Sequence, residues 1–239
     1  ILNLYMNIKG PLNGILVLDM SRVLAGPYCC MMLYEHGARV IKIERPLTGD
    51  DSRAFSPMIK GKSGYFTSVN YGKESIALNL KNTNDKKILK KLMKKADVLV
   101  EGFRPGVMKR LGLDYNSIKK EFPKLIYASI SGFGQTGPFS HKPAYDIVMQ
   151  GYGGIMSLTG PKGSKSPTKV GLSFADISSG LYCFSAINAA LYNREKTKKG
   201  SHVDIAQFDC QLGFETNQIM NYFNSKKIPG RKGLRHGSI

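Results

Sequence analysis

Asp176 is the residue of this sequence best placed for covalent chemistry. It stands in the segment GLSFADISSG (Gly171–Gly180), at the expected start of the strongest predicted helix, Asp176–Arg194. The dipole and free N–H groups of a first helical turn favour an ionised carboxylate, which can act as a nucleophile. Aspartate is equally a preferred N-cap, and Ser178 or Ser179 would cap a helix that began later. Position alone leaves both roles open, with capping the simpler interpretation.

The four cysteines do not indicate a metal site. Cys29, Cys30, Cys183 and Cys210 form no C-x-x-C pair, and no histidines stand at zinc-finger spacing. Cys29 and Cys30 lie in an apolar helical stretch, which is typical of buried thiols. We therefore expect no metal. No G-x-G-x-x-G follows the first predicted strand, so a nicotinamide enzyme is not favoured.

The chain is strongly basic, with 35 Lys and Arg against 17 Asp and Glu and a net charge of +18. The lysines are scattered, and no nucleic-acid-binding signature accompanies them, so solvated helix faces are favoured over nucleic-acid binding. A few basic residues facing a phosphorylated small ligand would also fit the positive field. The apolar runs are too short to span a membrane, and residues 1–5 lack the features of a signal peptide. We expect no membrane partner and a cytoplasmic protein.

Strand and helix patterns alternate along the chain. Short apolar runs predict strands at Gly14–Met20, Ala38–Glu44, Ser75–Leu80, Asp97–Glu101, Lys124–Ser131 and Ser201–Ala206. Helical patterns fall at Val23–His36, Asn84–Ala96, Gly106–Leu111, Tyr145–Leu158, Asp176–Arg194 and Gln207–Asn224. Alternation of this kind predicts an α/β fold, an open and mostly parallel Rossmann-like sheet with flanking helices.

Seven segments, in order and over nearly the whole chain, resemble the family III CoA-transferases, the group of formyl-CoA transferases and carnitine and bile-acid-inducible enzymes. They are Pro11–Cys29, Ala38–Arg53, Ala96–Tyr115, Ile130–Pro138, Tyr145–Gly154, Gly171–Gly180 and Gly200–Asp209. The resemblance implies that coenzyme A moves between an acyl-CoA and an acceptor carboxylic acid, with no permanently bound cofactor. Asp176 matches the family nucleophile, which forms an aspartyl anhydride and then an aspartyl–CoA thioester.

The same resemblance implies a set of coenzyme-A-binding residues. Basic side chains would pair with the phosphates, an aromatic ring would flank the adenine, and one turn would line the pantetheine end. The matching positions are Val23, Leu24, Ala25, Arg45, Leu78, Lys81, Phe103 and Arg110. Two positions depart from some relatives: Leu24 replaces a glutamine, and Phe55 stands near a tryptophan of the oxalate-using enzymes.

The domain expectations also follow from the resemblance. Residues 1–224 would form the N-terminal portion of a CoA-binding large domain, and 225–239 a linker towards a small domain that is missing here. Family members form intertwined homodimers when full length.

Two alternatives stay open. An α-methylacyl-CoA racemase has the same fold, but it places a His-Asp pair where this chain has Tyr145-Asp146. Tyrosine, with a usual pKa near 10, is a poor base at neutral pH. The second alternative is that the chain is an inactive, truncated fragment that binds coenzyme A.

Overall fold

The computed structural model describes residues 9–235, in which six strands form one sheet. The strand order is β5-β2-β1-β6-β7-β8, and every neighbouring pair is parallel. The strands are β1 (Leu16–Asp19), β2 (Arg39–Glu44), β5 (Glu74–Ala77), β6 (Val98–Glu101), β7 (Ile126–Ser131) and β8 (His202–Ala206). The predicted α/β fold with a parallel sheet is therefore confirmed, and all six predicted strands are present with slightly shorter bounds.

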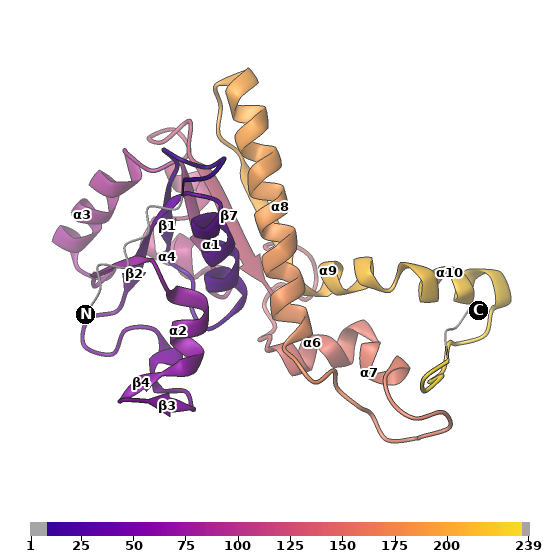
Figure 1. The fold of residues 1–239 in the computed structure, drawn as a ribbon. Helices are drawn as coiled ribbons and strands as arrows, with labels where there is room; N and C mark the ends of the chain where they lie inside the picture. Colours follow the sequence, from indigo (N-terminus) through magenta and orange to yellow (C-terminus); the bar gives the residue numbers. More distant parts are fainter. Residues whose placement is uncertain (1–8, 236–239) are drawn as a thin grey trace.

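Helices cover both faces of the sheet, which explains why its central strands β6 and β7 are buried throughout (Figure 1). One core cluster joins alternate strand residues to α1 (Ala25–Glu35) and α8 (Phe174–Thr197). The other joins the opposite face to α3 (Thr83–Met93), α4 (Val107–Leu111) and α5 (Tyr115–Ile118). The four cysteines are free and buried, as expected of Cys29 and Cys30.

Two predicted helices are interrupted. The expected helix Tyr145–Leu158 divides into α6 (Asp146–Gly153) and α7 (Ile155–Leu158) at Gly154, whose φ of 94° is left-handed. The expected helix Gln207–Asn224 divides into α9 (Gln207–Phe214) and α10 (Thr216–Ser225) at Glu215. Figure 1 shows these four helices extending to one side of the sheet, next to the N-terminal end of α8.

An insertion between β2 and β5 was not predicted. It contains the short helix η1 (Asp51–Ala54), the hairpin β3 (Met58–Ile59) and β4 (Lys62–Ser63), and helix α2 (Gly64–Asn70), which packs on α1. The elements are too short for periodicity to reveal them. Ser63 nevertheless caps α2 through its hydroxyl, which accepts a hydrogen bond from the Phe66 N–H at 3.1 Å.

The segment after α10 contains no helix or strand over residues 226–235, yet it is held in place. The Arg231 guanidinium donates hydrogen bonds to the carbonyls of Met156, Thr159 and Ser164 beside α7. The predicted boundary at 224/225 stays a prediction, and residues 1–8 and 236–239 of those ranges lie outside the described residues. Over residues 9–235, no helix combines the length and hydropathy needed to cross a membrane.

Candidate active site

A cavity of about 310 Å³ opens at the carboxyl ends of β1, β6, β7 and β8. The chain adds strands in one direction from β1 to β5 and in the other from β6 to β8, so the order reverses beside this cavity. Such a switch point is where open parallel sheets bind ligands. Of the residues predicted for a site, the cavity wall contains Val23, Leu24, Ala25, Phe103 and Asp176.

Asp176 is the third residue of α8, so the expectation that it caps the helix is wrong. The helix begins at Phe174, and Ser173 at the N-cap makes no side-chain cap bond. The carboxylate of Asp146 takes that place from the start of α6. Its Oδ1 accepts the backbone N–H of Ala175 at 2.8 Å and that of Asp176 at 3.4 Å. This cap is about thirty residues away in sequence, so local sequence signals could not reveal it.

Burial raises the pKa of the half-buried Asp176 carboxyl to about 6, and the nearby Asp146 carboxylate contributes in the same direction. The Gln207 amide opposes this, since its Nε2 donates to Asp176 Oδ1 at 2.5 Å. The expected effect of the helix N-terminus is therefore outweighed. At pH 7 roughly nine in ten such groups are still ionised. The result is a carboxylate that is ionised and more basic than usual.

Another part of the cavity wall is the turn that joins β1 to α1. Val23 has a φ of 67°, unusual for a β-branched residue, and Leu24 and Ala25 are each 8% exposed. Helices α1 and α8 meet closely here, because a Cβ built on Gly180 would lie 2.8 Å from the Ala25 carbonyl oxygen. The turn and Asp176 are thus fixed to each other through one helix pair.

Tyr65 of α2 is a neighbour that sequence reasoning missed. Burial raises its pKa to about 12, with further contributions from the carboxylates of Asp176, Asp146 and Asp50. Its phenol therefore lies near the candidate nucleophile and is neutral at physiological pH. Its ring meets that of Phe55 edge-on, with centroids 5.4 Å apart.

The remaining predicted binding residues lie outside the cavity wall. Arg45, Lys81 and Arg110 are exposed on segments that follow β2, β5 and β6, whereas Leu78 is 4% exposed in the core. Arg45 reaches towards the rim, because it pairs with Asp51, which lines the cavity. The structure brings Arg45, Lys81 and Arg110 to one edge of the sheet and into no shared contact.

The cavity has cations of its own, which sequence reasoning also missed. Arg22, Arg104 and Lys142 line it. The Arg22 guanidinium pairs with Asp51 at 2.9 Å and lies 5.4 Å from the centre of the Phe103 ring. Sequence could have pointed to Arg104, because it directly follows Phe103 in a segment that resembles the family.

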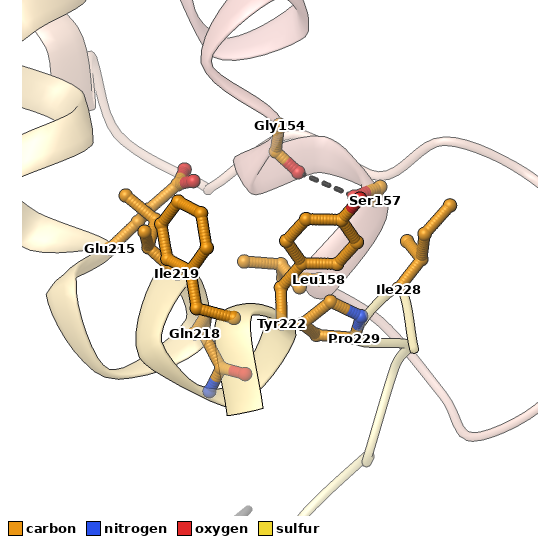
Figure 2. Close-up of a pocket in the computed structure, with 10 residues that line it drawn as sticks. Gly154, Ser157, Leu158, Glu215, Gln218, Ile219, Tyr222, Ile228 and Pro229 are labelled. Carbon is orange, nitrogen blue, oxygen red and sulfur yellow. Dashed lines mark hydrogen bonds between the residues drawn. The ribbon is translucent and has the colours of Figure 1, made fainter. Parts of the chain in front are cut away.

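Two further cavities lie elsewhere. One of about 240 Å³ separates α7 from α10, where Leu158, Ile219, Tyr222 and Ile228 surround an apolar space (Figure 2). Another of about 290 Å³ lies on the α4 and α5 side of the sheet and includes Glu101, whose pKa burial raises to about 7. Neither wall contains Asp176.

Among residues 9–235, no three His, Cys, Asp or Glu side chains are grouped as metal ligands.

Fold and site together define an α/β domain with an activatable carboxylate at a sheet switch point. The profile of CoA-transferase family III matches residues 12–239. The chain belongs to CoA-transferase family III.

Its relatives are named for several acid pairs. The chain is 50% identical over 230 residues to the acetyl-CoA:oxalate CoA-transferase of Acetobacter aceti, covering 95% of the chain and 59% of the relative. It is 43% identical over 241 residues to the succinate–glutarate CoA-transferase of Agrobacterium fabrum, covering 98% and 60%. A crystal structure of a CAIB/BAIF family protein from Brucella suis is 44% identical with a TM-score of 0.91, covering 97% of the chain and 62% of the other. The chain thus spans about 60% of the length of these relatives.

Proposed function

We propose that the protein transfers coenzyme A from an acyl-CoA to a carboxylic acid, with Asp176 as the nucleophile. One observation carries the proposal: in a chain of this family, Asp176 lines the switch-point cavity as a carboxylate with a pKa of about 6. A carboxylate that is ionised yet relatively basic is suited to attack a thioester carbonyl.

In the first step an Asp176 carboxylate oxygen attacks the thioester carbon and coenzyme A leaves as a thiolate, which gives a mixed anhydride. The thiolate then attacks the aspartyl carbonyl, releasing the donor acid and forming an aspartyl–CoA thioester. The acceptor carboxylate attacks this thioester, which regenerates an anhydride and the thiolate. Attack of the thiolate on the acceptor's acyl carbon frees Asp176 and yields the new acyl-CoA. No net oxidation, reduction or hydrolysis occurs.

The neighbouring side chains support Asp176 as the attacking residue. The Gln207 amide fixes Asp176 Oδ1, which leaves Oδ2 as the attacking atom. Asp146 fixes the backbone beneath Asp176 and keeps its carboxyl basic. For coenzyme A we propose the binding residues that the family resemblance implies. Val23, Leu24, Ala25 and Phe103 lie in the cavity wall. Arg45, Leu78, Lys81 and Arg110 lie on segments that follow strands β2, β5 and β6.

For the acids we propose a short-chain acyl donor and a small dicarboxylic acceptor. Relatives named for acetyl, oxalate, succinate and glutarate groups support this class. The cations Arg22, Arg104 and Lys142 in the wall would hold a second carboxylate of the acceptor. Phe55 stands near the position where the resemblance implies tryptophan in oxalate-using enzymes, which weighs against oxalate as the acceptor.

The racemase alternative has less support. Among the described residues, the wall of the cavity that contains Asp176 has no histidine to act as a base. Tyr145, at the position of the racemase histidine, is 75% exposed to solvent. Intertwined homodimer formation and a cytoplasmic location remain predictions.

The intact protein with Asp176→Ala tests the proposal. We expect CoA transfer to be lost while coenzyme A still binds, because most of the proposed binding residues lie on other segments. A parallel incubation with a chiral 2-methylacyl-CoA in deuterated water should show no exchange at Cα. Normal transfer by Asp176→Ala, or exchange without an acceptor acid, would reject the proposal.

A further inference from the structure

Four charged side chains are buried together beneath the turn that carries Val23. The side chains of Asp19 and Asp50 are 0% exposed, that of Lys73 is 1% exposed and that of Lys42 is 2% exposed. Lys42 Nζ lies 2.9 Å from Asp50 and 3.6 Å from Asp19, and Lys73 Nζ lies 2.9 Å from Asp19. The proposed transfer chemistry uses none of them.

These groups hold the turn by its backbone at three places. Lys42 donates to the Ser21 carbonyl at 3.0 Å, and Lys73 donates to the Pro27 carbonyl at 2.9 Å. Between them, the N–H of Val23 donates to both carboxylate oxygens of Asp50, at 3.1 and 3.3 Å. The segment held in this way contains the cavity residues Val23, Leu24 and Ala25.

Asp50 is itself fixed from several directions. The Ser52 N–H and hydroxyl both donate to its Oδ1, at 2.9 and 2.8 Å, and its own N–H donates to Glu44 Oε2 at 2.9 Å. Burial opposes ionisation of Asp50, yet Lys42 and Ser52 hold its pKa below the usual value. The carboxylate therefore stays charged where it meets Val23.

Burying four charged groups carries a large desolvation penalty. Buried ion pairs can often be replaced by apolar residues without loss of stability, so stability alone does not account for these four charges. The left-handed backbone of Val23, with a φ of 67°, is disfavoured for a β-branched residue and needs support from its surroundings. The contact from Asp50 supplies that support at the strained residue itself.

We propose that Asp50, paired with Lys42, is a positioning residue for acyl transfer that holds the Val23–Ala25 turn against Asp176. This inference rests on the proposed function. Asp50 touches no reacting atom and acts through the backbone of Val23.

Asp50→Asn in the intact protein tests the proposal by separating chemistry from binding. We expect the rate of Asp176 acylation, followed in a single turnover, to fall by roughly 10- to 100-fold, the order that a small misplacement of reacting groups costs. Affinity for coenzyme A should fall much less than the acylation rate, because, of the proposed binding residues, only Val23, Leu24 and Ala25 belong to this turn. An unchanged acylation rate in folded Asp50→Asn would overturn the proposal.

Asp97→Asn is the matched control. Asp97 also accepts a backbone N–H, that of Leu16 at 2.8 Å, and pairs with Arg194 at 2.9 Å, but it lies at the opposite end of β1. It should lower stability and leave the acylation rate per folded molecule unchanged. A loss equal to that of Asp50→Asn would show a general effect of losing a carboxylate that accepts a backbone N–H, and would overturn the proposal.

Ser52→Ala gives a second test if Asp50→Asn does not fold. It removes one donor to Asp50 while keeping the charge, and we expect a smaller loss of acylation with unchanged coenzyme A affinity. In a double-mutant cycle, Ser52→Ala should cost less in a Val23→Gly background, because glycine adopts a positive φ without strain. Strictly additive effects would contradict the proposal.

The failure of this inference can be told apart from the failure of the proposed function. If the wild-type protein shows no acylation at Asp176, the proposed function fails. If the wild-type protein is acylated and these variants are acylated at the same rate, this inference alone fails.

Discussion

The carboxyl group of Asp176 owes its raised pKa and its orientation to surroundings that a sequence motif does not describe. GLSFADISSG points to the residue, but Asp146 and Gln207, which influence its pKa and orientation, come from two other segments. Tyr65, whose own pKa Asp176 raises, comes from a third. Sequence could therefore single out Asp176 as a candidate, and its role as nucleophile stays a proposal. Its neighbours depend on how α2, α6, α8 and α9 meet, which no local pattern encodes.

The raised pKa predicts an acid limb in the rate of acylation. Only ionised Asp176 can attack, so the single-turnover rate should fall about tenfold per pH unit below a pH of about 6 and level off above pH 7. The rate should be measured between pH 4.5 and 8.5 as rough limits of the titration. A limb centred near the usual aspartate value of 3.8 would contradict this environment.

The same shift predicts that Asp176→Asn stabilises the protein. Because the folded pKa is above the usual value, the native state binds the proton more tightly, and stability falls as pH rises from about 4 to about 6. At pH 8 the variant should gain up to about 3 kcal/mol in the free energy of unfolding, at about 1.4 kcal/mol per pKa unit. This gain in the free energy of unfolding should vanish below about pH 4. Equal stability of the wild-type protein and Asp176→Asn at pH 8 would refute the raised pKa.

At the scale of elements, α8 depends on a cap supplied by α6. Asp146→Ala removes the acceptor for the Ala175 N–H and should lower the free energy of unfolding by about 1–2 kcal/mol. It should also move the acid limb of acylation to lower pH, since a negative charge beside Asp176 is lost. Asp209→Ala, at an exposed first-turn position of α9, is the control and should stay within about 0.5 kcal/mol. Denaturant unfolding measures both.

The contact between α1 and α8 depends on Gly180. A Cβ there would lie 2.8 Å from the Ala25 carbonyl oxygen and 3.0 Å from Tyr28 Cδ1. Gly180→Ala should therefore destabilise the fold by about 1–3 kcal/mol, despite the better helix propensity of alanine. Gly151→Ala in α6 is the control, because its Cβ would meet only Met156 Sδ at 3.8 Å. Thermal unfolding of both variants distinguishes a packing effect from a propensity effect.

Sequence periodicity predicts which helices and strands are present better than it predicts the residues at which they begin and end. The strand predicted at Gly14–Met20 is present because its apolar run is buried on both sides, as a central parallel strand requires. The start of α8 was misplaced by two residues, because Asp146 provides the cap from another helix. The break at Glu215 and the insertion around α2 depend on packing partners distant in sequence.

At the scale of the whole molecule, sheet topology turns separate motifs into one site. Because β1 and β6 are neighbours although about eighty residues separate them, the Val23 turn, Phe103 and Asp176 reach one cavity. The alternating pattern predicted a parallel sheet, whereas the order β5-β2-β1-β6-β7-β8 required the structure. The buried pairing of Asp19 with Lys42 follows from the register of β1 and β2 and was likewise invisible in the sequence.

The central claim is that Asp176 carries the acyl group and then coenzyme A. The most direct measurement mixes the intact protein with acetyl-CoA or succinyl-CoA, adds hydroxylamine and maps the product by mass spectrometry. The account predicts an aspartyl hydroxamate at residue 176 that depends on the acyl-CoA and is absent from Asp176→Asn. Modification at another residue, or no modification with any short-chain acyl-CoA, would contradict it.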